Sequence, residues 1–150
     1  MQAAQAVAEE LARSGLATTV RDVAHGTPAD LPADSLVVLG SCSWLRQTAD
    51  GPQQGALPAH MHRFVQALLQ QKRPGRPFAV FAFGRHEYTK FCGAADHLEE
   101  AVRASGGYLV TDSLRVDGFF AENEAAIREW ARSVRSAINA APVGSLTENS

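Results

Sequence analysis

The six residues 78–83 constrain the fold more than any other part of this chain. They read Phe-Ala-Val-Phe-Ala-Phe, without a polar side chain. Unbroken apolar runs of this length are typical of parallel strands, which are covered by other elements on both faces. Residues 35–40 contain a second such run, and a segment with helical spacing separates the two. Two buried strands joined through a helix predict an α/β protein.

Apolar residues at helical spacing predict four helices: residues 2–14, a stripe over 61–69, a segment through Leu98 and Val102, and a final helix ending near Ile138. Residues 16–23 and 108–116 are predicted as two further strands. Residues 45–57 are polar and contain glycine, so we expect a loop there. This alternation of strands and helices predicts a doubly wound parallel sheet in a three-layer α/β/α arrangement.

Composition limits the class of protein. A chain of 150 residues with 45% hydrophobic content is long enough for one domain. A net charge of −2 gives no basic stripe for nucleic acid, and no apolar run approaches the roughly 20 residues that span a bilayer. The first residues lack the features of a secretory signal. We therefore expect a soluble, cytoplasmic protein, with no nucleic-acid or membrane partner, that is a monomer with both cysteines reduced.

Two loops follow the two buried strands and carry the candidate site. Because the carboxyl ends of parallel strands meet at one edge of the sheet, ligands of open α/β folds bind there. Glycine lets the backbone approach a flat ligand closely, and one aromatic on each loop could hold one flat ring between them. The candidate residues are Ser41, Cys42, Ser43 and Trp44 in the first loop, and Gly84, Arg85, His86, Tyr88, Phe91 and Cys92 in the second.

These loops resemble those of the flavodoxin family. Residues 83–94 are similar to the loop that lies against the isoalloxazine ring of FMN, and Gly-Ser-Cys-Ser-Trp at 40–44 resembles the family's Gly-Cys-Ser-Thr-Trp. The resemblance covers roughly residues 1–139. It implies a flavodoxin-like sheet with strand order 2-1-3-4-5. It also implies one noncovalent FMN between Trp44 and Tyr88, with backbone groups of Gly84, Phe91 and Cys92 at its pyrimidine edge.

The resemblance implies a carrier of single electrons between redox partner proteins, a reductase and an electron acceptor, rather than an enzyme. One alternative is the FMN module of a flavin-dependent reductase, although the chain has no dinucleotide-binding fingerprint. A second alternative is a degenerate flavodoxin fold that no longer binds FMN. Arg85, His86 and Lys90 around Tyr88 would favour the anionic reduced flavin, so we expect a less reducing flavin than is usual in the family.

The predicted strands correspond to the second to fifth of a flavodoxin, so the central first strand and its phosphate loop are not found before residue 2. Residues 1–139 are predicted as the domain and 140–150 as a tail. The end of that tail, Gly-Ser-Leu-Thr-Glu-Asn-Ser, resembles the family's phosphate loop, Gly-Ser-x-Thr-Gly-Asn-Thr. Read from tail to head, the chain keeps the family spacing into the first helix. The candidate phosphate ligands are Ser145, Thr147, Asn149 and Ser150.

Two interpretations of this tail stay open. In the first, the order of segments is circularly permuted and the tail supplies the displaced strand and loop. In the second, it is a disordered tail on a chain whose true start is lost, because Pro142 suits a central strand poorly. Glu148 stands where the family has glycine, which adds a carboxylate beside a phosphate. Elsewhere, Trp130 is expected in the core, and His60 and His62 are not expected to bind metal.

Overall fold

The computed structural model describes residues 2–31, 35–42, 44–48, 51–71, 74–84 and 93–139. Four α-helices lie in these ranges: α1 (Gln2–Ala12), α2 (Ala59–Gln70), α3 (Gly93–Ala104) and α4 (Phe120–Asn139). The described strands are β1 (Val37–Cys42), β2 (Trp44–Thr48), β3 (Gly51–Ala56), β4 (Pro77–Gly84), β5 (Tyr108–Leu109) and β6 (Leu114–Asp117). Two short 3-10 helices, η1 (Val23–His25) and η2 (Pro28–Asp30), precede β1.

Strand β4 is the centre of a parallel sheet. β1 pairs with it from Val37 opposite Phe78 to Cys42 opposite Phe83. β5 pairs with the first residues of β4, and β6 pairs with its last four. The pairings of β4 with β1, β5 and β6 are all parallel, which confirms the predicted fold class.

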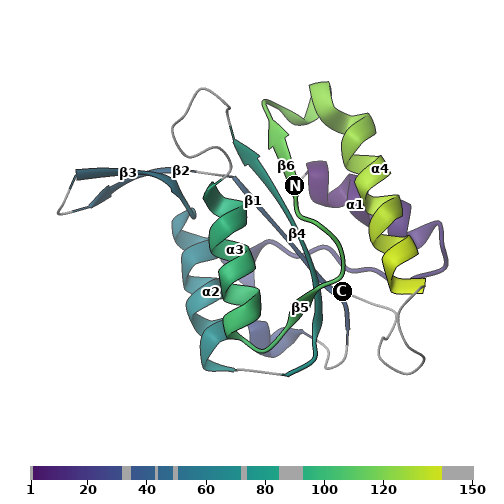
Figure 1. The fold of residues 1–150 in the computed structure, drawn as a ribbon, viewed down its shortest axis with the longest axis horizontal. Coiled ribbons are helices and arrows are strands. Elements are labelled where there is room, and N and C mark those ends of the chain that lie inside the picture. Colours follow the sequence, from purple (N-terminus) through teal and green to yellow (C-terminus); the bar gives the residue numbers. More distant parts are fainter. Residues whose placement is uncertain are drawn as a thin grey trace.

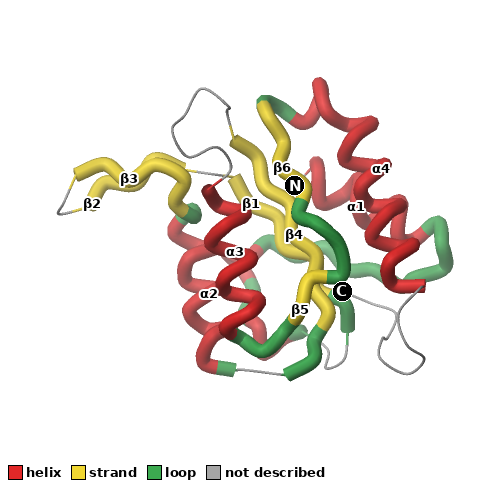
Figure 2. The backbone as a smooth tube through the Cα atoms, in the orientation of Figure 1, coloured by secondary structure: helices red, strands yellow, loops and turns green. Residues whose placement is uncertain are grey.

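Helices cover both faces of the sheet, as Figures 1 and 2 show. Alternate residues of β4 point to opposite faces. Phe78, Val80 and Ala82 pack in one buried cluster with α2 and α3. Ala79 and Phe81 pack in a second cluster with α1 and α4. The absence of polar residues in β4 thus follows from burial on both faces.

The strand predicted at residues 16–23 is not formed. Residues 16–22 have no regular secondary structure, and Val23 begins η1. A strand forms only where a neighbour pairs with its N–H and C=O groups. Within the described ranges, no strand lies beside this segment, because β1 is the last strand on that side of the sheet. The apolar pattern at 16–23 was therefore insufficient without its neighbour.

The strand predicted at 108–116 is interrupted. β5 and β6 each pair with β4. The N–H of Val110 still donates to the carbonyl oxygen of Phe78, and residues 111–113 form no strand. The indole N–H of Trp130 donates to the carbonyl oxygen of Asp112 at 3.0 Å, which fixes this interruption against α4. Trp130 is buried, and its ring lies 5.7 Å from that of Phe81, as expected for a core residue.

Residues 45–57 were predicted as a loop, but most of them form an antiparallel hairpin. β2 and β3 pair from Trp44 opposite Ala56 to Thr48 opposite Gly51. The hairpin extends away from the sheet in Figure 1. Its second strand contains glycine, proline and glutamine, residue types that carry no apolar alternation. The sequence pattern therefore gave no strand signal.

Ion pairs join the carboxyl-terminal part of α1 to the middle of α4. The buried carboxylate of Glu10 accepts hydrogen bonds from Arg13 and Arg132, each at 3.3 Å, and lies 3.6 Å from Nη1 of Arg128. Arg128 donates to Glu124 at 2.9 Å and to Glu9 at 3.0 Å. These hydrogen bonds, that to Glu124 first, raise the pKa of the Arg128 guanidinium, so it stays charged. The network fixes α1 against α4.

Candidate functional site

The carboxyl ends of β1 and β4 lie side by side. Their register sets Ser41 opposite Ala82 and Cys42 opposite Phe83, so both strands end at the same level. Ser41 is half-buried and Cys42 is exposed. The segments that follow the two strands therefore leave from one edge of the sheet, as predicted from the two apolar runs.

One backbone and one side-chain hydrogen bond order this edge. The carbonyl oxygen of Gly84 accepts from the N–H of Gly118 at 3.0 Å, which joins the ends of β4 and β6. Gly118 has a φ of +98°, a conformation that glycine adopts without strain, and it turns the chain toward α4. The hydroxyl of Ser41 donates to the carbonyl oxygen of Cys42 at 3.2 Å. The three strand ends thus form one ordered platform.

The structure brings together three of the predicted site residues, namely Ser41, Cys42 and Gly84. The backbone of Trp44 begins β2, two residues after β1 ends. The other predictions fall outside the described residues: Ser43, Arg85, His86, Tyr88, Phe91, Cys92, Ser145, Thr147, Asn149 and Ser150. The placement of the ring-binding aromatics and of the phosphate ligands therefore stays a prediction.

An ion pair near the same edge was not predicted. Arg115 of β6 donates to Asp96 at 2.7 Å and to Glu99 at 3.4 Å, both on α3. Glu99 also accepts from the hydroxyl of Ser113 at 2.6 Å. No sequence signal joined these residues, because the pairing depends on how α3 packs against the sheet.

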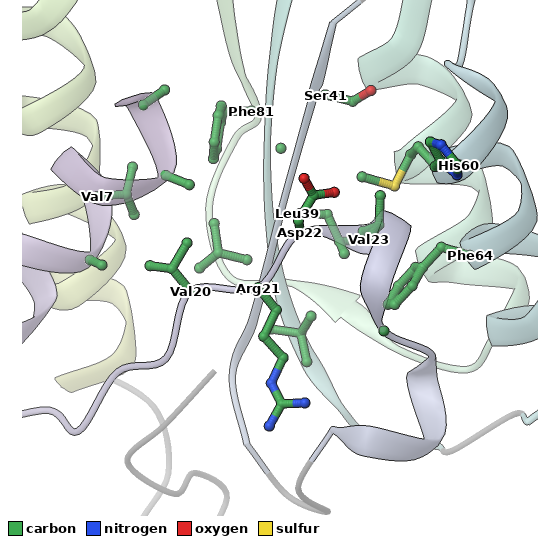
Figure 3. A pocket seen from close by; sticks show the side chains of 18 of the residues that line it. Val7, Val20, Arg21, Asp22, Val23, Leu39, Ser41, His60, Phe64 and Phe81 are labelled. Atoms are coloured by element: carbon green, nitrogen blue, oxygen red, sulfur yellow. The ribbon is translucent and has the colours of Figure 1, made fainter. Parts of the chain in front are cut away.

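A cavity of about 450 Å³ lies along β1, and Phe81 and Phe83 of β4 also reach its lining. All six residues of β1 line one of its sides, and residues 19–23 line another. Figure 3 shows Val7 of α1 at one flank and His60 and Phe64 of α2 at the other. The sequence did not predict this cavity directly. The predicted elements did lack the central first strand, however, and in the strand order 2-1-3-4-5 that strand would lie beside β1.

The described residues contain no group of three or more histidine, cysteine, aspartate or glutamate side chains that could hold a metal ion. His60 is exposed, and its ring nitrogen Nδ1 contacts the Arg63 guanidinium. His62 is half-buried. Of the helices within the described ranges, none has both the length and the apolar character needed to cross a bilayer.

The architecture is that of solved flavodoxins. Oxidised flavodoxin 2 from Bacillus cereus superposes with a TM-score of 0.77 over 89% of this chain and 88% of that one, at 23% identity. A parallel sheet with helices on both faces and converging strand ends defines the chain as a flavodoxin-like α/β protein.

Sequence comparison is more specific than the fold. The flavodoxin family model matches residues 1–130. The flavodoxin of Maridesulfovibrio salexigens is 30% identical over 116 residues, 77% of this chain and 76% of the relative. The flavodoxin of Nitratidesulfovibrio vulgaris is 30% identical over 135 residues, 90% of this chain and 88% of the relative. The chain belongs to the flavodoxin family, whose members are electron-transfer proteins with FMN as cofactor.

Proposed function

We propose that this chain binds one FMN noncovalently at the carboxyl edge of β1 and β4 and carries single electrons between a reductase and an electron acceptor. Family membership supports the cofactor and the electron-transfer role. The single observation that carries the site is the register of the two strands, Cys42 opposite Phe83, because both candidate loops start from these ends.

The chemistry of the edge fits a flat, uncharged ring system. Ser41, Cys42 and Gly84 present a hydroxyl, a thiol and a bare backbone, which leave room beside the strand ends. Gly84 is held in place by its hydrogen bond from Gly118. Bulky charged side chains do not occupy these three positions, so a ring that approaches the edge meets small groups and main chain.

Particular residues would hold the cofactor. Trp44 and Tyr88 would cover the two faces of the ring, and backbone groups of Gly84, Phe91 and Cys92 would meet its pyrimidine edge. The phosphate would be bound by groups from Ser145, Thr147, Asn149 and Ser150, together with the N-terminus of α1. When bound, FMN accepts and donates electrons one at a time. The protein holds and orients it, and the neighbouring charges set how readily it is reduced.

We place this carrier in the cytoplasm as a monomer. No substrate pocket is needed for electron transfer, because the electron moves between cofactors of two proteins in contact. Arg85, His86 and Lys90 would lie beside the ring and favour reduced FMN.

Titration of FMN fluorescence with the purified protein tests this proposal. Quenching that saturates at one FMN per chain is expected, and weaker binding of riboflavin would show that the phosphate contributes. Absence of quenching by either compound would contradict the proposal and favour a degenerate fold without FMN. Oxidation of NAD(P)H by the isolated, FMN-loaded chain would instead favour a reductase module.

A further inference from the structure

The cavity beside β1 has the shape of a strand position rather than of a pocket for a compact ligand. All six residues of β1 line it, so it runs along the whole strand, about 20 Å at the usual rise per residue. Among the described residues, β1 pairs on its other side with β4 and has no strand on this one. Such an edge presents backbone N–H and C=O groups that can pair with an added strand. We call this cavity the β1 slot.

Both walls of the β1 slot are largely apolar, with His60 as a polar residue on the α2 side. Val7 and Leu11 of α1 close one wall, and Met61 and Phe64 of α2 close the other. Successive side chains of a strand point in opposite directions, so a strand in the slot would direct them alternately toward α1 and α2. Figure 3 shows Val7 and Phe64 facing the cavity from these two flanks. This two-sided cover is what buried parallel strands require.

The side of the slot opposite β1 is a length of main chain that pairs with no strand among the described residues. Residues 19–23 line it, and no regular strand forms in 16–22. This segment was predicted as a strand from its sequence. A strand in the slot would give it the neighbour that it lacks, and the sheet would then continue across the slot.

We propose that residues 140–150 of this chain fill the β1 slot as a strand parallel to β1. α4 follows the carboxyl end of β6 and extends for 20 residues, about 30 Å, back to the amino ends of the strands. Figure 1 shows α4 running in this direction. The tail therefore starts at the end of the sheet from which a parallel strand must start.

The tail is long enough to reach the slot and to fill it. Ile138, at the end of α4, belongs to the same buried cluster as Leu36, the residue before β1. The tail must then cross from the helix layer into the sheet, about 10 Å, and run the length of β1. Its eleven residues span about 36 Å when extended. Pro142 falls in the crossing, where a missing N–H group breaks no pairing.

The length of the tail also limits which of its residues can contact the FMN phosphate. This assignment of phosphate contacts rests on the proposed function. If residues 143–148 lie along β1, only Asn149 and Ser150 arrive at the carboxyl edge. There they would meet the first turn of α1, where Ala3 and Ala4 line the slot. With this strand in place, the four phosphate ligands of the proposed function are reduced to Asn149 and Ser150, and Ser145 and Thr147 lie within the strand instead.

Hydrogen exchange of β1 amides, followed by mass spectrometry on the full-length chain, tests the strand. Leu146→Pro removes a backbone donor within the proposed strand, whereas Ala141→Pro changes the crossing. We expect residues 37–42 to exchange at least about 10-fold faster in Leu146→Pro than in the parent, and at the parent rate in Ala141→Pro. Exchange of β4 should be the same in all three proteins, which shows that the fold is intact.

Equal exchange of β1 in all three proteins would overturn the proposal. Protection of β1 that disappears on dilution, together with a dimer by size-exclusion chromatography, would show that a second copy supplies the strand and would also overturn it. FMN titrations of the same samples separate the two proposals. FMN binding to a chain with an unprotected β1 rejects the strand alone, and a protected β1 without FMN binding rejects the proposed function alone.

Discussion

The ring of Phe81 lies against Gly40, its register partner on the neighbouring strand. A β-carbon built on Gly40 would come within 2.0 Å of Cζ of Phe81. The glycine that ends the second apolar run of the sequence is thus required by packing on the face covered by α1 and α4. Because Gly40 has no side chain, β1 also lies in close contact with β4 just before the candidate site.

Substitution Gly40→Ala should destabilise the protein. Because the methyl group would overlap a buried ring, we expect a loss of about 1–3 kcal/mol in the free energy of unfolding. Urea denaturation measures it. Phe81→Leu shortens the opposing side chain, so Gly40→Ala should cost less in that background. Equal costs in both backgrounds would show that the ring is not the obstacle.

Substitution Glu10→Gln should loosen α1 from α4. It removes the charge from a buried carboxylate that receives hydrogen bonds from Arg13 and Arg132. We expect a loss of about 1–3 kcal/mol in stability, since hydrogen bonds to charged groups are the stronger ones. Glu129→Gln on the exposed side of α4 is the control and should change stability by less than about 0.5 kcal/mol. Matching losses for the two variants would contradict a role of the network.

The aromatic pair should determine FMN affinity. Replacement of Trp44 or Tyr88 by alanine removes one proposed ring contact, and we expect a 10- to 100-fold weaker Kd, about 1.4–2.8 kcal/mol. Isothermal titration calorimetry measures it. Trp130→Phe is the matched control, because Trp130 is a core residue whose loss should lower stability but leave FMN affinity within about threefold. An unchanged Kd in both alanine variants would place the ring elsewhere.

Charge beside the ring should set the reduction potential. Arg85→Glu replaces a cation with an anion, so reduced FMN should become harder to form and both potentials should fall by on the order of tens of millivolts. Arg103→Glu makes the same charge change on an exposed position in the last turn of α3. Potentiometry on both variants separates the effect of a charge beside the ring from the effect of the protein's net charge. Potentials that do not move in Arg85→Glu would exclude this residue as a determinant.

Where burial dominates, the sequence predicted the fold well. The apolar runs that form β1 and β4, and the stripes that form the helices, are visible because their side chains meet a core on one or both faces. The pattern at 16–23 failed because a strand also needs a partner, and the β1 slot lies where that partner belongs. The hairpin of β2 and β3 was missed because its sequence carries no apolar alternation.

The candidate site could be located from sequence but not completed. The positions of Ser41, Cys42 and Gly84 follow from where two parallel strands end, which the apolar runs predict. The pairing of Arg115 with Asp96 and Glu99 could not be anticipated, since it joins residues 16 to 19 positions apart that only the packing of α3 on the sheet brings together. The roles of Trp44 and Tyr88 at the ring stay predictions, because no periodic pattern in a sequence encodes the orientation of a single side chain outside the core.

The absorption spectrum of the purified protein, recorded with added FMN and during stepwise reduction, tests the central claim most directly. The account predicts a flavin spectrum that remains with the protein through gel filtration at one FMN per chain and is reduced in two resolved one-electron steps. A protein that elutes colourless after incubation with FMN would contradict it.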